Sequence, residues 1–264
     1  IFSDILMVPY GMGQSVEFKK NFGPNLGDIN INEFLNLNES DFVEKLSPIY
    51  KLLHILRKSE ELKNRDLIGF VGAPWTLLVY IINKVSPKNG LSDSFSRNIN
   101  LINNMLNLLD KFIKIHIKNQ VNAGATIIQI FDSWAGLVNE EFDKYLYNPT
   151  LSLVEYTKDL GVPVICFPRN IKNYKNYCEI VKPNAISIDY NVNPNQILKD
   201  IKIPVQGGMD PKILLTDKET LRKETKRYLD IFKDHPYIFN LGHGILPETN
   251  PNMVDYLVKM VKDH

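Results

Sequence analysis

The chain has 264 residues, and its 31 basic and 30 acidic side chains give a formal net charge of +1. This balance excludes the global positive field of many nucleic-acid-binding proteins. Hydrophobic residues make up 44% of the chain, while its longest apolar runs fall far short of the ~20 residues that span a bilayer. We therefore expect a globular protein with a sizeable core, no nucleic-acid partner and no membrane span.

The first residues resemble the end of a buried strand. The run Ile1-Phe2-Ser3-Asp4-Ile5-Leu6 starts abruptly, without Met, a helix cap or a signal-peptide pattern. We expect the chain to be truncated at its N-terminus, with the beginning of this strand upstream of Ile1.

Six short apolar runs follow, separated by helix-like stretches. They are rich in Ile and Val, and each has Gly, Pro or a polar residue at its C-terminal end. This pattern is typical of parallel strands that are covered on both faces. The predicted strands are 67–72, 126–131, 163–167, 185–189, 203–208 and 237–241.

Helices fill the gaps between these strands. Residues 94–122 repeat apolar side chains near helical spacing, with Lys and Asn on the opposite face. Asn148-Pro149 predicts the start of a second helix. Thr216-Asp217-Lys218-Glu219 fits a capping box that starts a helix to about Phe232, and Asn250-Pro251 predicts the start of the last one.

The alternation of strands and helices without a clear linker predicts one α/β domain over residues 1–264. The chain lacks the signatures of dinucleotide-binding and P-loop folds, since neither G-x-G-x-x-G nor G-x-x-x-x-G-K occurs. Short crossovers after Phe167 and Asp189 favour a TIM barrel over a wide doubly wound sheet. We therefore expect a (β/α)8 TIM barrel that lacks the first strand and most of the second.

The two cysteines, Cys166 and Cys178, lie in a strand-like and a helix-like run. A disulfide framework is not expected, and a reducing compartment such as the cytoplasm fits this pattern. No histidine is adjacent to either cysteine in sequence, so we expect no structural zinc site.

Polar side chains lie at or just past the C-terminal ends of the predicted strands, where TIM barrels place their active sites. They include Asp4, Tyr80, Asp132, Ser133, Arg169, Asp189, Asp210 and His243. Some have simpler interpretations. Asp210 before Pro211 favours a helix N-cap over a ligand, and Ser133 is equally suited to cap a helix. Trp75 and Trp134 are most simply packing residues.

The segment around His243 is the most informative of these. Two glycines flank the histidine at the tip of the last apolar run, so the backbone can turn sharply and a ligand can approach closely. The competing interpretation is a strand-to-helix turn with an incidental histidine.

Five segments of the chain form a distinctive series: Phe2-Ser3-Asp4-Ile5-Leu6, Gly69-Phe70-Val71-Gly72-Ala73-Pro74-Trp75-Thr76-Leu77, Gln129-Ile130-Phe131-Asp132-Ser133-Trp134-Ala135-Gly136, Gln206-Gly207-Gly208-Met209-Asp210-Pro211 and Asn240-Leu241-Gly242-His243-Gly244. In this order they resemble the signature segments of the uroporphyrinogen decarboxylase family, and the match runs over essentially the whole chain. Five long motifs in order are far more specific than any one of them.

The resemblance implies a (β/α)8 barrel that works without metal or organic cofactor, commonly as a homodimer. It also implies removal of the four acetate carboxyl groups of uroporphyrinogen III to give coproporphyrinogen III in haem and chlorophyll synthesis. Asp4 matches the aspartate that accepts hydrogen bonds from the pyrrole N–H groups. Tyr80, Ser133 and His243 match substrate-contacting residues, and Phe2 and Phe131 match apolar walls beside the macrocycle. We expect a neighbouring carboxylate to raise the pKa of His243.

Two departures from the family are visible. Nothing in residues 1–264 matches its arginine-rich R-Q-A-G-R-Y segment, and the frequent Asn of Q-G-N-x-D-P is Gly208 here. The family's substrate carries eight carboxylates, yet Arg169 alone among the arginines of this chain follows a predicted strand. We expect the intact family member to be active and the 264-residue piece to bind substrate poorly.

Two other functions remain open at this point. A corrinoid-dependent methyltransferase of the same barrel superfamily would need zinc held by histidine and cysteines, and no H-x-C pattern lies near Cys166 or Cys178. A non-catalytic tetrapyrrole-binding protein is favoured only by the absent arginine segment.

Overall fold

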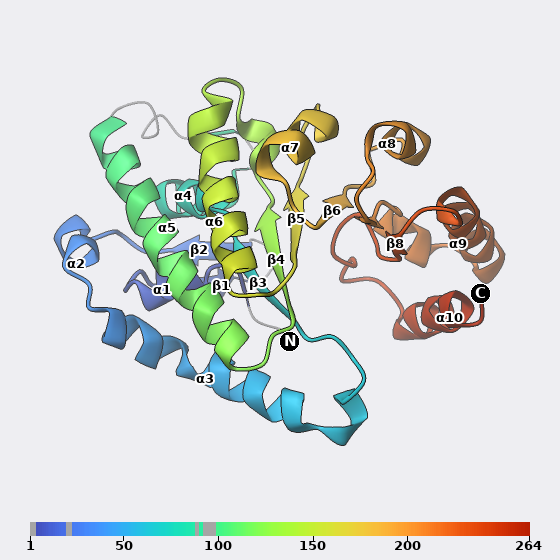
Figure 1. Ribbon diagram of the computed structural model, residues 1–264, viewed down its shortest axis with the longest axis horizontal. Helices are drawn as coiled ribbons and strands as arrows, with labels where there is room; N and C mark the ends of the chain where they lie inside the picture. The colour runs from blue at the N-terminus through green and yellow to red at the C-terminus, as the bar shows by residue number, and fades with distance from the viewer. Residues whose placement is uncertain (1–3, 20–22, 88–89, 92–98) are drawn as a thin grey trace.

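The computed structural model describes residues 4–19, 23–87, 90–91 and 99–264 (Figure 1). Its centre is a six-stranded sheet in which every neighbouring pair is parallel. The strands lie side by side in chain order, β3-β4-β5-β6-β7-β8. They are β3 (Ile68–Gly72), β4 (Ile127–Asp132), β5 (Val164–Pro168), β6 (Ala185–Ile188), β7 (Val205–Gly207) and β8 (Tyr237–Ile238).

All six predicted strands are confirmed, and their order identifies the winding. A doubly wound sheet reverses its strand order at a switch point, whereas a barrel adds each new strand beside the previous one. The observed order contains no reversal, so the sheet winds as a (β/α) barrel does. The predicted strand tail at Ile1 and Phe2 lies outside the described residues.

Helices cover one face of the sheet, with α5 against β3, α4 against β4 and α6 against β5. The long helix α3 packs on the outer side of α5, and α9 packs with α10 near the C-terminus (Figure 1). The α-helices are α1 (Met7–Gly11), α2 (Ile31–Leu35), α3 (Glu39–Lys58), α4 (Pro74–Asn83), α5 (Ile99–Asn122), α6 (Asn148–Asp159), α7 (Tyr174–Val181), α8 (Pro194–Asp200), α9 (Lys218–Phe232) and α10 (Pro251–Lys262). Short 3-10 turns are η1 (Glu60–Leu62), η3 (Ala135–Leu137) and η5 (Pro211–Leu215), and η4 (Asp143–Tyr147) is a π-helix.

The structure also contains a hairpin that the sequence pattern did not predict. Strands β1 (Val16–Lys19) and β2 (Gly23–Leu26) pair antiparallel. The Leu26 N–H donates to the Lys84 carbonyl at the end of α4 with an N···O distance of 2.7 Å, which anchors the hairpin to the domain. A strand that reads Gly-Pro-Asn-Leu carries no hydrophobic alternation and was therefore missed.

The start of one helix, α9, differs in detail from the sequence prediction. Asp217, not Thr216, caps α9, because its Oδ1 accepts from the N–H groups of Glu219 and Thr220. The predicted helix start at Asn148-Pro149 is confirmed, because Asn148 is the first residue of α6 and directly follows the π-helix η4. The predicted caps Asp210 and Asn250 are confirmed, each accepting from the backbone N–H two residues ahead.

None of the helices in the described ranges has the length and apolar character needed to cross a bilayer.

Candidate active site

The parallel sheet brings the C-terminal ends of all six strands to one edge, and most predicted site residues lie there. Asp4 reaches this edge through its neighbour Ile5. A β carbon built at Gly72, the last residue of β3, would lie 3.2 Å from the Ile5 Cβ. Asp4 therefore lies beside the end of β3, although it is far from that strand in sequence.

Asp4 is half-buried and does not point freely into bulk water. Its Oδ1 accepts from the Leu6 N–H at 2.8 Å, and its carbonyl accepts from the Met7 N–H at the start of α1. Burial raises the pKa of the Asp4 carboxyl, and the Leu6 hydrogen bond partly opposes this rise. Phe2, the predicted wall residue two positions earlier, lies outside the described residues.

Phe131 belongs to a row of three aromatic rings across neighbouring strands. Phe70 of β3 and Phe167 of β5 lie edge-on to its ring, at centroid distances of 5.7 and 6.0 Å. Side chains alternate along a strand, and the next residue, Asp132, points toward the helices. Phe131 therefore faces the opposite side of the sheet, where its ring contacts those of Phe70 and Phe167. Phe70 and Phe167 were not predicted as site residues.

Tyr80 and Ser133 are brought together by Trp134. Tyr80 lies on the second turn of α4 and is only 9% exposed, with its ring centroid 5.9 Å from that of Trp134. Ser133, half-buried, directly precedes Trp134 in the loop after β4. Ser133 does not cap the following helix, because Trp134 stands at the N-cap of η3. Tyr80 therefore packs on the residue that follows Ser133 in the chain.

Asp132 departs from its predicted place on the rim. Its carboxyl is 1% exposed and points to the helix side, where Oδ1 and Thr76 Oγ1 are 2.6 Å apart. Thr76 also accepts from the Trp134 N–H at 3.0 Å, so it connects α4 to the loop after β4. Burial raises the pKa of Asp132 to about 7, and the Thr76 hydrogen bond lowers it. Asp132 therefore holds the loop that carries Ser133.

Asp189 is likewise an anchor and not an open rim residue. Its Oδ2 accepts from the Asn170 N–H at 2.8 Å and from the Tyr174 hydroxyl at 3.1 Å, while its Oδ1 accepts from the Asn191 N–H. These bonds tie the loop after β5 to the end of β6. Sequence position at a strand end could not distinguish this role from ligand binding.

His243 is exposed on the turn after β8, where Gly242 packs against the backbone of Asp189 and Tyr190. Its pKa is lowered, first by partial burial and then by the positive charge of Arg169, while Asp189 acts in the opposite direction. The expected rise in the pKa of His243 is therefore wrong, because burial and the Arg169 guanidinium together outweigh the Asp189 carboxylate. Arg169 and His243 share one stretch of the site edge.

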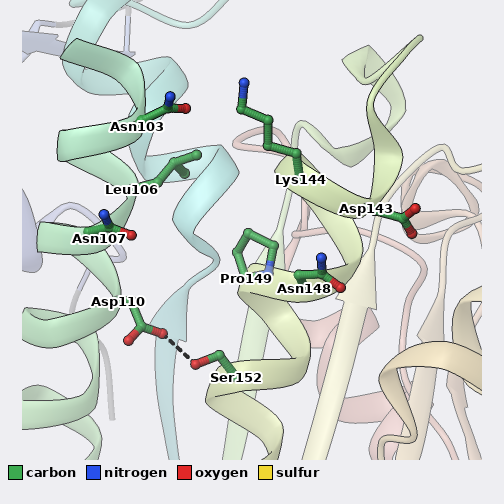
Figure 2. Close-up of a pocket in the computed structure, with 9 residues that line it drawn as sticks. All are labelled: Asn103, Leu106, Asn107, Asp110, Asp143, Lys144, Asn148, Pro149 and Ser152. Carbon is green, nitrogen blue, oxygen red and sulfur yellow. Dashed lines mark hydrogen bonds between the residues drawn. The ribbon is translucent and has the colours of Figure 1, made fainter. Parts of the chain in front are cut away.

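A groove on the outer helix layer is separate from this edge. Figure 2 shows that its lining residues come from α5 and the η4–α6 segment. The volume of the groove is about 640 Å³. Asp110 accepts from the Ser152 hydroxyl at 2.8 Å and pairs with Lys114 Nζ at 2.7 Å. These polar groups satisfy one another, so the groove is explained by packing between two helices.

The cysteines show no arrangement for a metal. Cys166 is buried in β5, Cys178 is half-buried in α7, and burial raises the pKa of each thiol to about 12. Thiolate, the form that binds zinc, is therefore strongly disfavoured at both positions. Within the described ranges, no group of three or more His, Cys, Asp or Glu side chains is placed to hold a metal ion.

The chain as a whole resembles known proteins. A family model described as uroporphyrinogen decarboxylase (URO-D) matches residues 1–264. The uroporphyrinogen decarboxylase of Rickettsia bellii is 37% identical over 271 residues, which cover 100% of this chain and 79% of the relative. The chain belongs to the uroporphyrinogen decarboxylase family. Another member, from Wolbachia sp. subsp. Drosophila simulans, is 37% identical over 272 residues. The match covers 100% of this chain and 78% of that relative's length.

The fold of this family member is also found in a distant solved structure. A methyltransferase from Methanosarcina mazei superposes with a TM-score of 0.76 at 16% sequence identity, covering 100% of this chain and 79% of that one. At this identity the likeness concerns the fold alone, and it agrees with the TIM-barrel winding of the sheet.

Proposed function

We propose that this protein is a uroporphyrinogen decarboxylase that removes the four acetate carboxyl groups of uroporphyrinogen III and yields coproporphyrinogen III without a cofactor. The observation that carries the proposal is the family match over all of residues 1–264, with relatives of that name at 37% identity. The placement of Asp4, Phe131 and Ser133 at one sheet edge supports it.

The reaction needs an electron sink, because loss of carbon dioxide leaves an electron pair on the methylene carbon. A pyrrole ring protonated beside the acetate side chain can accept this pair as the C–C bond breaks. Reprotonation of the methylene carbon then gives a methyl group, and the ring loses its extra proton. The substrate thus supplies the sink itself.

Asp4 is the residue proposed to stabilise this cationic ring. A carboxylate in a site with little water stabilises a developing positive charge by several kcal/mol. The Leu6 N–H bond to Oδ1 fixes the carboxyl group before substrate binds. In the free protein, burial raises the pKa of Asp4, and pyrrole N–H donors would favour the ionised form on binding.

The remaining residues would orient the macrocycle. Phe131, in its aromatic row, would contact a face of the macrocycle, as would Phe2. Tyr80, Ser133 and His243 would donate hydrogen bonds to substrate carboxylates. Because Tyr80 packs on Trp134, a shift in the loop after β4 would change the positions of Tyr80 and Ser133 together.

The small-molecule substrate is the principal partner in this proposal, and we further propose a homodimer in the cytoplasm, with no nucleic-acid or membrane partner. Two free cysteines and the near-neutral net charge of +1 are consistent with this setting.

Anaerobic incubation with uroporphyrinogen III tests the proposal directly. The protein, expressed from its complete coding sequence, should convert it through hepta-, hexa- and pentacarboxylate intermediates to coproporphyrinogen III, separated as oxidised porphyrins by chromatography. Activity should be unchanged by metal chelators. A protein that consumes no substrate would overturn the proposal, and a chelator-sensitive methyl transfer would point to the methyltransferase class.

A further inference from the structure

Hydrogen bonds fix the backbone of Arg169. It follows Pro168, the last residue of β5, and its N–H donates to the Asp132 carbonyl at 3.0 Å. Its own carbonyl accepts from the Gly136 N–H, also at 3.0 Å. The backbone is therefore fixed on both sides, and the guanidinium extends from a defined point at the site edge.

The charge of Arg169 has no counter-charge in the described part of the chain. Its Nε is buried and has no hydrogen-bond partner there, and no carboxylate of those residues lies within ion-pair distance. Arg227 provides the contrast, because Glu224 accepts from both its Nε and its Nη2. A half-buried guanidinium whose Nε has no acceptor among the described residues favours an anionic ligand.

His243 lies on the same stretch of the edge through shared contacts with Asp189. The Asn170 N–H, next to Arg169 in the chain, donates to Asp189 Oδ2 at 2.8 Å. A β carbon at Gly242 would lie 2.8 Å from the Asp189 carbonyl carbon, so the residue before His243 rests on the same aspartate. The carboxylate of Asp189 is occupied by three donors and does not form an ion pair with Arg169.

We propose that Arg169 and His243 together bind one carboxylate of the substrate, with Arg169 as the specificity-determining residue of this pair. The inference rests on the proposed function and extends it to a residue with no assigned role. The planar guanidinium offers two parallel N–H donors to a carboxylate, and the imidazole offers a third. Burial and repulsion by Arg169 lower the pKa of His243, and binding of the anion would offset the repulsion.

Three variants test this proposal. Arg169→Gln removes the charge, Arg169→Lys keeps it but loses the planar fork, and Arg65→Gln is the control. Arg65 is exposed and precedes β3, at the opposite edge of the sheet. We expect Arg169→Gln to raise the KM for uroporphyrinogen roughly tenfold or more with a smaller change in kcat, and Arg169→Lys to raise it less. Arg65→Gln should match the wild type.

Binding of coproporphyrinogen, followed by quenching of tryptophan fluorescence, gives a second readout that needs no turnover. A weaker Kd in Arg169→Gln would identify the bound group as a propionate, which the product keeps. An unchanged Kd with a raised KM would identify it as an acetate. Thermal unfolding measurements check that each variant folds. If Arg169→Gln does not fold, Arg169→Lys takes its place in the KM and Kd comparison.

The outcomes separate the two proposals. Suppose that the wild type is active and that Arg169→Gln and Arg169→Lys both have the same KM and Kd as Arg65→Gln. This result would overturn the proposal that Arg169 and His243 bind a carboxylate, and it would leave the proposed function intact. A wild type without activity would overturn the proposed function, and if it also fails to bind coproporphyrinogen, the carboxylate pair falls with it.

Discussion

Gly242 lies directly on the backbone that joins Asp189 to Tyr190. A β carbon at position 242 would come within 2.8 Å of the Asp189 carbonyl carbon and closer still to the Tyr190 amide nitrogen. The Gly242 N–H also donates to the Met209 carbonyl at 2.7 Å. The turn that carries His243 is therefore fixed against the loops after β6 and β7 by a contact that only glycine permits.

Gly242→Ala should destabilise the protein, because backbone atoms cannot move aside as a flexible side chain can. We expect a loss of roughly 1–3 kcal/mol in the free energy of unfolding, measured by urea denaturation, and a raised KM as His243 shifts. Gly244→Ala is the matched control, since a β carbon there meets nothing within 4 Å. Equal stability of the two variants would contradict the close approach at position 242.

Asp4→Asn should abolish turnover while the fold survives. The amide is nearly isosteric and its oxygen can still accept from the Leu6 N–H, but it carries no negative charge for a protonated pyrrole ring. Loss of one electrostatic stabiliser costs about 10²–10³ in kcat in well-studied sites. Anaerobic steady-state kinetics and circular dichroism would measure both properties. Near-normal kcat would remove Asp4 from the mechanism.

The sheet could be predicted from sequence because each strand is a short, nearly continuous run of Ile and Val bounded by Gly, Pro or polar residues. Runs such as 126–131 and 163–167 differ from the observed β4 and β5 by a single residue at each end. The hairpin β1–β2 could not be found, since tertiary contacts at Leu26 stabilise it in the absence of an apolar pattern.

The site was predicted only in part. Position at a strand end told which residues reach the edge, but not which way each one points. Asp132 and Asp189 lie at the edge of the sheet, but their carboxylates point inward. They form hydrogen bonds with Thr76 and Asn170, which are not their neighbours in sequence. The effect of Arg169 on His243 depends equally on distance in space, so the direction of the His243 pKa shift could not be read from the chain.

Asp132 should make stability depend on pH in an unusual direction. Its pKa is about 7 in the folded protein, against an ordinary value of 3.8, so between these values the folded state binds more protons than the unfolded state. The free energy of unfolding therefore falls as pH rises from 4 to 7, by at most about 1.4 kcal/mol per pH unit from this group. Above pH 7 the contribution is constant.

Asp132→Asn tests this linkage, because the amide cannot titrate. The wild type minus variant difference in unfolding free energy should decrease steadily from pH 4 to pH 7 and then level off. Thr76→Val should move the plateau to higher pH, since the hydroxyl lowers the pKa of Asp132. A difference that is flat with pH would show that Asp132 is ionised throughout.

His116 acts in the opposite direction. It is buried on α5, its Nδ1 lies 2.9 Å from the Tyr50 hydroxyl, and burial lowers its pKa to about 3 from the ordinary 6.5. Below pH 6.5, His116 is protonated in the unfolded state but stays neutral in the folded state. The free energy of unfolding therefore decreases as pH falls toward 3. This loss amounts to about 1 kcal/mol or more per pH unit from the single histidine.

His116→Gln should reduce this acid sensitivity, because glutamine can accept from the Tyr50 hydroxyl but does not titrate. We expect its unfolding free energy, followed by urea denaturation between pH 7.5 and 4.5, to fall less steeply than that of the wild type. His54→Gln, at an exposed position on α3, controls for the substitution itself. If His116→Gln and the wild type lose stability in parallel, His116 must gain its proton in the folded state, and another group must account for the acid sensitivity.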